Sequence, residues 1–225
     1  FLNTVVPYGD PLYYDYRKTV GIAQTDVLPI NDRHGFHPAM APIKALYEKG
    51  KVAVIPGVGY PEPDRSHFRS MDIWHTAEPK KFITEGWLGR TIRELDPEKQ
   101  NGVTGVSFGS GLPRAMYLQG TPVISVARLE GYGLLNSLAG EAQRKAVKAF
   151  TRMYAPVEFD EARMIMDHLG QTGRDALAGA DLLKTAPPKY QSSVEYAHDP
   201  LSQNLKGIAQ VLLAGLGTRV FYAEF

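Results

Sequence analysis

Apolar and turn-forming residues alternate along this chain in blocks that predict strands and helices in succession. Short apolar runs next to glycine or proline predict buried strands at residues 51–56, 103–108, 123–126 and 218–225. Apolar residues at helical spacing predict helices at residues 38–49, 68–75, 87–95, 141–154, 160–184 and 205–216. This order predicts an α/β fold with a mostly parallel sheet and helices on both faces, the helical block around 140–185 being an insertion.

The first 36 residues carry a different pattern, because turn formers and tyrosines dominate them. We expect a long loop there with one short β-like piece at 19–23, and a loop of this length in a compact domain is usually functional. A chain of 225 residues suits one α/β domain or two small ones. We expect residues 1–225 to form a single domain.

Charge and composition exclude several classes of protein. The 25 basic and 24 acidic residues are interspersed and leave a net charge of +1, so the basic stripe of a nucleic-acid-binding protein is absent. The lack of cysteine excludes disulfides, thiolate metal sites and a cysteine nucleophile. No apolar run approaches the roughly 18 residues of a membrane-spanning helix, so we expect no membrane span. The chain opens at Phe1 without an initiator methionine, which is compatible with a removed signal.

A polar cluster, Pro-Asp-Arg-Ser-His-Phe at residues 63–68, lies between the predicted strand at 51–56 and a helix. The carboxyl end of a parallel strand is where open α/β sheets bind ligands, and free N–H groups at a helix amino end favour an anion. Two interpretations of Ser66 stay open, a helix cap or a nucleophile and anion ligand. A serine nucleophile needs a base or a metal ion. Because neighbours on a helix do not face each other, metal activation is favoured over a Ser66–His67 dyad.

Histidines and glycines elsewhere favour structural roles. His34 and His37 lie three residues apart, and His67 and His75 eight apart, so neither pair has the i, i+4 spacing of a helical zinc site. The glycine-rich run at 105–111 lacks the Lys-Ser/Thr ending of a P-loop and the full spacing of a dinucleotide fingerprint, so it predicts a strand and a tight turn.

Three further residues are assigned to the core or the surface. In the Gly-Trp-Leu-Gly-Arg segment at 86–90, we expect Trp87 to anchor the helix in the core and Arg90 to be a surface charge. His198 lies among polar residues and is predicted to be at the surface.

Several segments, taken in order, point to a known family. They are Leu-Asn-Thr-Val-Val-Pro-Tyr at 2–8, Phe-His-Pro at 36–38, the apolar run at 51–59, Arg-Ser-His-Phe at 65–68, Gly-Trp-Leu-Gly-Arg at 86–90 and Gly-Thr-Arg-Val-Phe-Tyr at 217–222. Together they resemble a bacterial family classed as a domain of unknown function, whose members generally carry a twin-arginine export signal. That family is related to the alkaline phosphatase and sulfatase superfamily, and the resemblance covers essentially all 225 residues.

The resemblance implies a fold and a chemistry. The fold would be an alkaline-phosphatase-like three-layer α/β/α arrangement, in an exported or periplasmic protein that hydrolyses a small anionic ester of phosphate or sulfate. Ser66 falls at the nucleophile position, as a catalytic residue and a metal ligand, with Arg65 and His67 assisting. A divalent metal such as zinc or calcium, together with helix N–H groups, would stabilise the developing charge.

The remaining metal ligands of that family lie outside this sequence. A Gly-Gly-x-Asp-Gly segment precedes Leu-Asn-Thr in the family, and a Phe-Asp-Thr-His segment follows the closing strand. We therefore expect the chain to be truncated at both ends, and to be metal-poor and inactive by itself. Two alternatives stay open: an exported binding or assembly protein that keeps the fold without turnover, and a cytoplasmic enzyme of unrelated chemistry.

Overall fold

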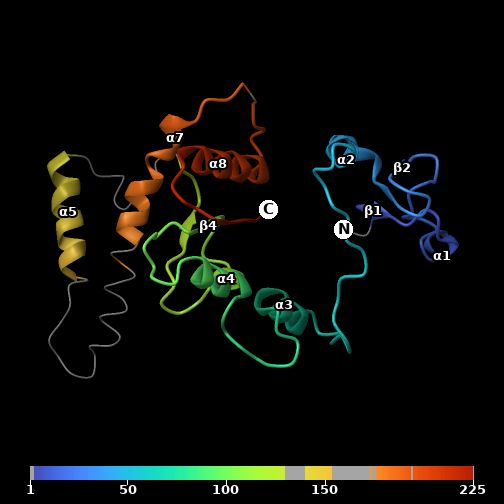
Figure 1. The fold of residues 1–225 in the computed structure, drawn as a ribbon, viewed down its shortest axis with the longest axis horizontal. Helices are drawn as coiled ribbons and strands as arrows, with labels where there is room; N and C mark the ends of the chain where they lie inside the picture. Colours follow the sequence, from blue (N-terminus) through green and yellow to red (C-terminus); the bar gives the residue numbers. More distant parts are fainter. Residues whose placement is uncertain (1–2, 130–139, 154–172, 174–175, 194, 225) are drawn as a thin grey trace. The chain divides into compact units, whose positions relative to one another are not determined.

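The chain has a mixed α/β fold with two small sheets (Figure 1). The computed structural model describes residues 3–129, 140–153, 173, 176–193 and 195–224. It divides the chain into two compact units, Phe1–Pro61 and Glu62–Phe225. No helix within these described ranges is long and apolar enough to cross a membrane.

The first unit is built on three very short antiparallel strands, which pair in the order β1 (Val5–Val6), β3 (Gly35–Phe36) and β2 (Leu28–Pro29). Helix α1 (Pro11–Tyr16) begins where the Asp10 side chain accepts a hydrogen bond from the N–H of Leu12. Tyr13 is buried, and its hydroxyl donates to Asn3 and accepts from the N–H of Ile22, each at 2.8 Å. The prediction of an irregular loop over 1–36 is therefore wrong in part. The β-like piece predicted at 19–23 is wrong, because these residues form no strand.

The helix predicted at 38–49 is confirmed as a 3-10 turn, η1 (Pro38–Met40), followed by α2 (Ala41–Glu48). The buried strand predicted at 51–56 is wrong, because residues 51–60 form no strand and are mostly exposed. Ile55 is 75% exposed and Val58 68% exposed. A strand needs a partner for its N–H and C=O groups, and this run pairs with no other strand in the described part of the chain.

The second unit contains a parallel sheet of three strands. The order is β5 (Ile124–Val126), β4 (Gly105–Phe108) and β6 (Val220–Ala223), so the central strand is β4. Phe108, the last residue of β4, is level with Val126 on one side and Ala223 on the other. The strands predicted at 103–108, 123–126 and 218–225 are confirmed, and their carboxyl ends lie together.

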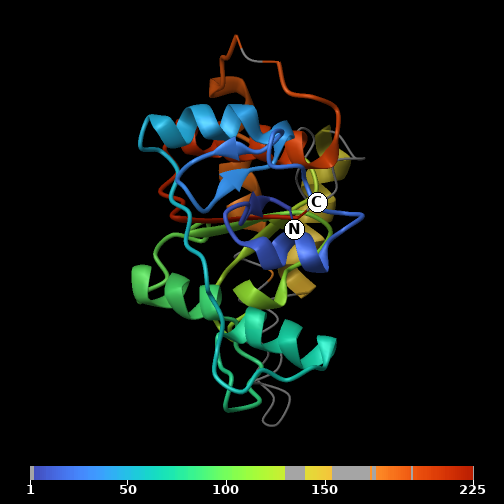
Figure 2. The same ribbon diagram turned by 90° about the vertical axis from the view of Figure 1, so that its right-hand side faces the viewer.

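Helices pack against this sheet on both faces (Figures 1 and 2). On α4 (Trp87–Leu95), Ile92 lies against the Gly105 side of β4, where a Cβ on Gly105 would meet Ile92 Cδ1 at 2.4 Å. On α8 (Pro200–Ala214), Gly207 lies against the ring of Phe108, which points to the other face because side chains alternate along a strand. The buried core on that face includes Val106, Phe108, Val126, Leu183 and Val211.

The other predicted helices have mixed outcomes. The helices at 68–75 and 87–95 are confirmed as α3 (His67–Thr76) and α4, and the helix at 141–154 as α5 (Gly140–Met153). The final helix starts five residues before the predicted 205, since Asp199 caps α8 at Pro200. Residues 176–183 are helical and lead to α7 (Ala186–Lys189), whereas most of the prediction at 160–184 lies outside the described residues.

Candidate functional site

Ser66, the predicted nucleophile, is the N-cap of α3. Its backbone is extended, with φ −71° and ψ 122°, and its Oγ accepts a hydrogen bond from the N–H of Arg69 at 3.4 Å. The carboxylate of Asp64 accepts from the N–H of Ser66 at 2.7 Å. These contacts satisfy N–H groups that lack partners at a helix start. The capping interpretation of Ser66 is thereby confirmed, and its hydroxyl stays exposed.

Arg65 and His67 flank Ser66 on the surface. Both side chains are exposed, and among the described contacts neither makes a hydrogen bond to the Ser66 hydroxyl. Adjacent residues at a helix start point in different directions, which explains the separation. The three predicted catalytic residues are therefore neighbours in the sequence, but no described hydrogen bond joins Arg65 or His67 to the Ser66 hydroxyl.

A divalent metal ion was expected in the full-length protein, with Ser66 as one ligand and the other ligands outside this chain. Within the described ranges, no three side chains among His, Asp and Glu come close enough together to hold a metal ion. Asp64 is the carboxylate that contacts the Ser66 segment, and it is already bound to the Ser66 N–H. One carboxylate and one hydroxyl fall short of the ligand sets of zinc or calcium sites, so the described residues do not fit the metal.

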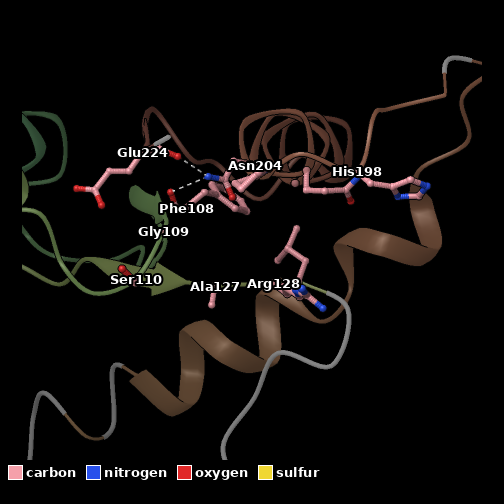
Figure 3. A pocket seen from close by; sticks show the side chains of 12 residues that line it. Phe108, Gly109, Ser110, Ala127, Arg128, His198, Asn204 and Glu224 are labelled. Atoms are coloured by element: carbon pink, nitrogen blue, oxygen red, sulfur yellow. Dashed lines mark hydrogen bonds between the residues drawn. The ribbon is translucent and has the colours of Figure 1, made fainter.

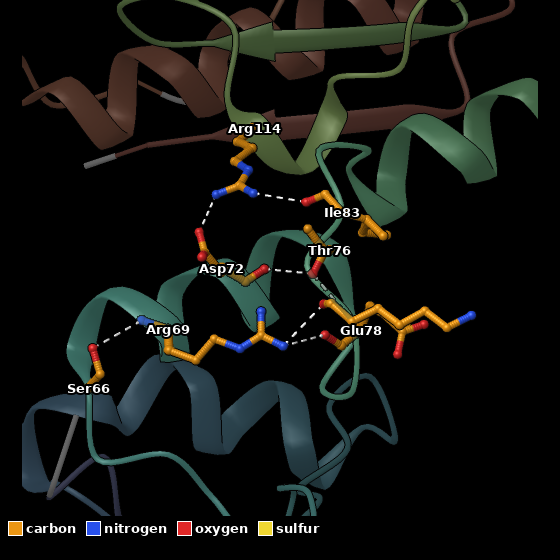
Figure 4. A network of polar contacts seen from close by, with 8 residues as sticks. Ser66, Arg69, Asp72, Thr76, Glu78, Ile83 and Arg114 are labelled. Atoms are coloured by element: carbon orange, nitrogen blue, oxygen red, sulfur yellow. Dashed lines mark hydrogen bonds and ion pairs between the residues drawn. The ribbon is translucent and has the colours of Figure 1, made fainter.

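Three arginines hold the segment that follows α3 through hydrogen bonds, and Figure 4 shows two of them, Arg69 and Arg114. Arg69 is 9% exposed, and its Nη2 donates to the carbonyls of Glu78, Pro79 and Lys81 at 3.2, 2.9 and 3.1 Å. The guanidinium of Arg69 also lies 4.0 Å from the centre of the Phe82 ring. A buried guanidinium needs such acceptors, because desolvating an unpaired charge is costly.

The other two arginines act in the same way. Arg114 forms an ion pair with Asp72 on α3 and donates to the carbonyl of Ile83 at 3.0 Å. Arg90 donates to the carbonyls of Glu85 and Thr76 at 3.1 and 2.7 Å. The prediction of Arg90 as a plain surface charge is thus wrong, because its guanidinium binds one carbonyl at the end of α3 and one just before α4.

Trp87 does not anchor α4 in the core, since it is 42% exposed. Glycine, rather than tryptophan, lets α4 pack closely. A Cβ on Gly86 would lie 2.1 Å from the carbonyl oxygen of Ala115, and one on Gly89 would lie 2.9 Å from that of Met116. The Gly-Trp-Leu-Gly-Arg motif therefore serves close packing and the fastening of the segment after α3.

A cavity of about 840 Å³ lies where the three parallel strands end (Figure 3). We call it the carboxyl-edge pocket. Phe108 and Gly109 come from the end of β4, Ala127 and Arg128 from the end of β5, and Glu224 from the end of β6. His198, in the segment before α8, and Asn204, on α8, line its remaining side. Open parallel sheets bind ligands at this edge.

Asn204 holds two of the strand ends in place from α8. It is 9% exposed, and its Nδ2 donates to the carbonyls of Phe108 at 3.3 Å and Glu224 at 2.9 Å. The N–H of Glu224 also donates to the carbonyl of Phe108 at 3.2 Å. Gly207, one turn further along α8, lets the helix approach closely, because a Cβ there would lie 2.4 Å from the Phe108 ring. The polar wall of the pocket is thus fixed by both backbone and side chain.

The amino end of α8 is capped by the side chain of Asp199. Asp199 accepts a hydrogen bond from the N–H of Ser202 at 2.9 Å. Hydrogen bonds from the Ser202 side chain and backbone hold the pKa of Asp199 below its ordinary value. The carboxylate of Asp199 is thus occupied as the N-cap of α8. The basic side chains that line the pocket are Arg128 and His198.

Charge in the carboxyl-edge pocket is divided between two sides. Arg128 and His198 are exposed, and Arg128 forms no ion pair with any described residue. In Figure 3 the carboxylate of Glu224 extends to the side away from His198. It lies near Gly109 and, after burial, is the second cause of the raised pKa of Tyr222. The side with Arg128 and His198 can therefore accept an anion.

The sequence patterns did not predict this pocket. The run at 105–111 predicted a strand and a tight turn, which is correct for the backbone, and His198 was predicted to be at the surface, where it is exposed. One available signal was that three predicted parallel strands must end at one edge. No feature of the sequence marked Asn204 as part of a pocket, because it lies within an ordinary amphipathic helix.

Comparison with known proteins found no matching family model, no similar curated protein and no similar solved structure. The function must therefore be argued from the geometry of the chain itself.

Proposed function

We propose that this chain binds a small phosphate or sulfate ester in the carboxyl-edge pocket. One observation carries the proposal: three parallel strands end at a cavity of about 840 Å³ in which Arg128 has no ion-pair partner among the described residues. Guanidinium groups bind phosphate and sulfate oxygens through paired N–H groups, which a lysine cannot do.

The size and the polarity of the pocket support a small organic anion. Binding cavities for small molecules are commonly about 300–1,000 Å³, with a few placed polar groups among apolar ones. Phe108 and Leu129 supply apolar walls, while Ser110, Arg128 and His198 supply hydrogen-bonding groups. An ester with one anionic head and one organic part matches this division better than a free inorganic ion does.

Binding is tested by titrating the full chain with phenyl phosphate and phenyl sulfate in a calorimeter. Removing the guanidinium in Arg128→Gln should weaken binding about tenfold, as expected for loss of one charge-assisted pair. Arg144→Gln, at an exposed position of α5, is the matched control and should bind like the wild type. Equal binding by Arg128→Gln and the wild type would contradict the proposal.

Hydrolysis of an ester at the start of α3, separate from the carboxyl-edge pocket, is the second candidate, and the exposed Ser66 at the start of a ten-residue helix favours it. By resemblance, the protein would be an exported hydrolase of the alkaline-phosphatase-like kind, with Ser66 as nucleophile and Arg65 and His67 assisting. No step of this candidate passes through a metal ion held by the described residues. A base outside them must then take the Ser66 proton.

Turnover of p-nitrophenyl phosphate and p-nitrophenyl sulfate tests the hydrolase candidate, with the protein in its longest available form. Ser66→Ala should abolish turnover, while Ser70→Ala, one turn further along α3, should retain it. If both variants keep the wild-type rate, Ser66 is not the nucleophile. If the wild type itself turns over neither ester, binding without turnover remains as the function.

A further inference from the structure

A second cavity, of about 580 Å³, adjoins the carboxyl-edge pocket. His198 and Gln203 line both cavities, so the two share a wall. The loop between α7 and α8 contributes Tyr190 and Tyr196 to the second cavity, and α8 contributes Lys206. We call it the tyrosine pocket. A ligand with its anionic head beside Arg128 could extend its organic part past His198 and Gln203 into this space.

Hydrogen bonds set the shape of the tyrosine pocket. The hydroxyls of Tyr190 and Tyr196 are 3.1 Å apart, and their ring centres are 6.5 Å apart. Gln203 reaches from α8 to donate its Nε2 to the carbonyl of Ala197 at 2.7 Å. This contact ties the loop to the helix, so the side chains on both sides of the shared wall are held together.

The pKa values of the two tyrosines shift in opposite directions. The hydrogen bonds with Ser192 and Tyr196 lower the pKa of Tyr190, while the hydrogen bond with Tyr190 raises the pKa of Tyr196. Each hydroxyl oxygen can also accept a hydrogen bond from a ligand. Gln191 and Lys206 add an amide and an ammonium group to the lining.

We infer that the tyrosine pocket binds the hydroxyl-rich organic part of the ester, which makes the ligand a sugar phosphate or sugar sulfate. The inference rests on the function proposed for the carboxyl-edge pocket and names its substrate class. The lining offers hydroxyl, amide and ammonium groups and the carboxylate of Glu195, which can pair with the alternating hydroxyls of a sugar, whereas an alkyl or aryl group would use none of them. The faces of the two tyrosine rings offer apolar surface for the C–H groups of a sugar.

A calorimetric comparison of orthophosphate, phenyl phosphate and glucose 6-phosphate tests the inference on the wild-type chain. Glucose 6-phosphate should bind at least about tenfold more tightly than the other two, because two or more hydrogen bonds of about 1 kcal/mol each are added. Equal binding of all three would overturn the inference and leave anion binding intact. Failure of all three to bind would overturn the proposed function itself, and with it the inference.

The double variant Tyr190→Phe and Tyr196→Phe sharpens the test, since it removes both hydroxyls and keeps both rings. Its affinity for glucose 6-phosphate should fall about tenfold, while its affinity for orthophosphate stays unchanged. Tyr16→Phe, at a position 78% exposed in the first unit, is the control. An equal loss for both ligands would show that the hydroxyls shape the carboxyl-edge pocket and do not contact the sugar, which contradicts the inference.

Discussion

Two polar regions of the second unit differ in how their polar groups are used. At the amino end of α3, the Ser66 hydroxyl caps the helix and the Asp64 carboxylate binds a backbone N–H. At the carboxyl-edge pocket, the backbone and Asn204 satisfy each other, and Arg128 lines a cavity without an ion-pair partner among the described residues. The first region uses its polar groups to build the fold, whereas the second has an arginine without a described ion-pair partner, which we propose binds the ligand.

The difference shows that residue type is a weak guide to function until the partners are known. The cluster at 63–68 held a hydroxyl, an imidazole and a guanidinium, and it attracted the functional interpretation for that reason. Burial and hydrogen bonding then separate the roles, because a capping hydroxyl satisfies N–H groups and a buried arginine satisfies carbonyls. Predictions that separate the two regions should change stability at one and binding at the other.

The largest effect on stability is expected from Arg69→Leu. Loss of the guanidinium leaves the carbonyls of Glu78, Pro79 and Lys81 without their donor, at an expected cost of about 3 kcal/mol in the free energy of unfolding. Urea unfolding measures this. Arg93→Leu, at an exposed position of α4, should change stability by less than about 0.5 kcal/mol. A stable Arg69→Leu chain would mean that this arginine is not structural.

Gly207→Ala should destabilise the second unit by about 2 kcal/mol, since the new methyl group overlaps the Phe108 ring. It should also weaken ester binding, because α8 forms one wall of the carboxyl-edge pocket. Gly59→Ala adds a methyl group where nothing lies within 4 Å and should be neutral in both measurements. Wild-type stability of Gly207→Ala would contradict the close approach of α8 and β4.

Asn204→Ala should cost about 1.5 kcal/mol in the free energy of unfolding, because two carbonyls at the ends of β4 and β6 lose their donor. The strand ends should then separate, so binding of phenyl phosphate should weaken together with stability. Gln210→Ala on the same helix, away from the lining, is expected to affect stability alone. If Asn204→Ala keeps both wild-type stability and wild-type binding of phenyl phosphate, the pocket wall is held by other contacts.

Ser66→Ala should lower stability by about 1 kcal/mol through loss of the α3 cap and should leave ester binding within about twofold of the wild type. Ser66→Asp restores a capping oxygen and should recover most of that stability. Thermal unfolding and a ligand titration measure the two quantities side by side. Weaker ester binding by Ser66→Ala at unchanged stability would move the ligand site to α3.

The smallest effect is expected in how the free energy of unfolding changes at acid pH, and it comes from Asp96, which follows α4. Hydrogen bonds from the backbone of Asn101, and further ones from Gln100 and Thr104, hold the pKa of Asp96 below its ordinary value of 3.8. A lowered folded pKa gives stability that is present above pH 3.8 and is lost as the pH falls through the folded value. Asp96→Asn should be less stable than the wild type at pH 6, and the gap should close toward pH 3. If the difference in stability between the wild type and Asp96→Asn does not change with pH, the charge of Asp96 is not its cause.

The sequence predicted the second unit better than the first. Its short apolar runs at β4, β5 and β6 lie next to glycine or proline, and local spacing suffices to place such strands. The run at 51–56 has the same local pattern and forms no strand, because strand formation depends on a partner that local pattern does not report. In the first unit, strands of two residues carry too little pattern to be recognised.

The candidate site was the least predictable part. Arg128 is far in sequence from His198 and Asn204, and the ends of the strands together with α8 bring them to the same cavity. Ser66, by contrast, was placed correctly at a helix start by its local context alone. Local pattern therefore predicts caps, while a pocket requires the tertiary arrangement.

An NMR titration of the isotope-labelled chain with phenyl phosphate tests the central claim most directly, because it reports where the ester binds. The account predicts that the backbone amide signals of Gly109, Ser110, Ala127 and Arg128 shift with ligand concentration, and that those of Ser66 and His67 do not. Shifts confined to the start of α3, with the strand ends unchanged, would contradict it.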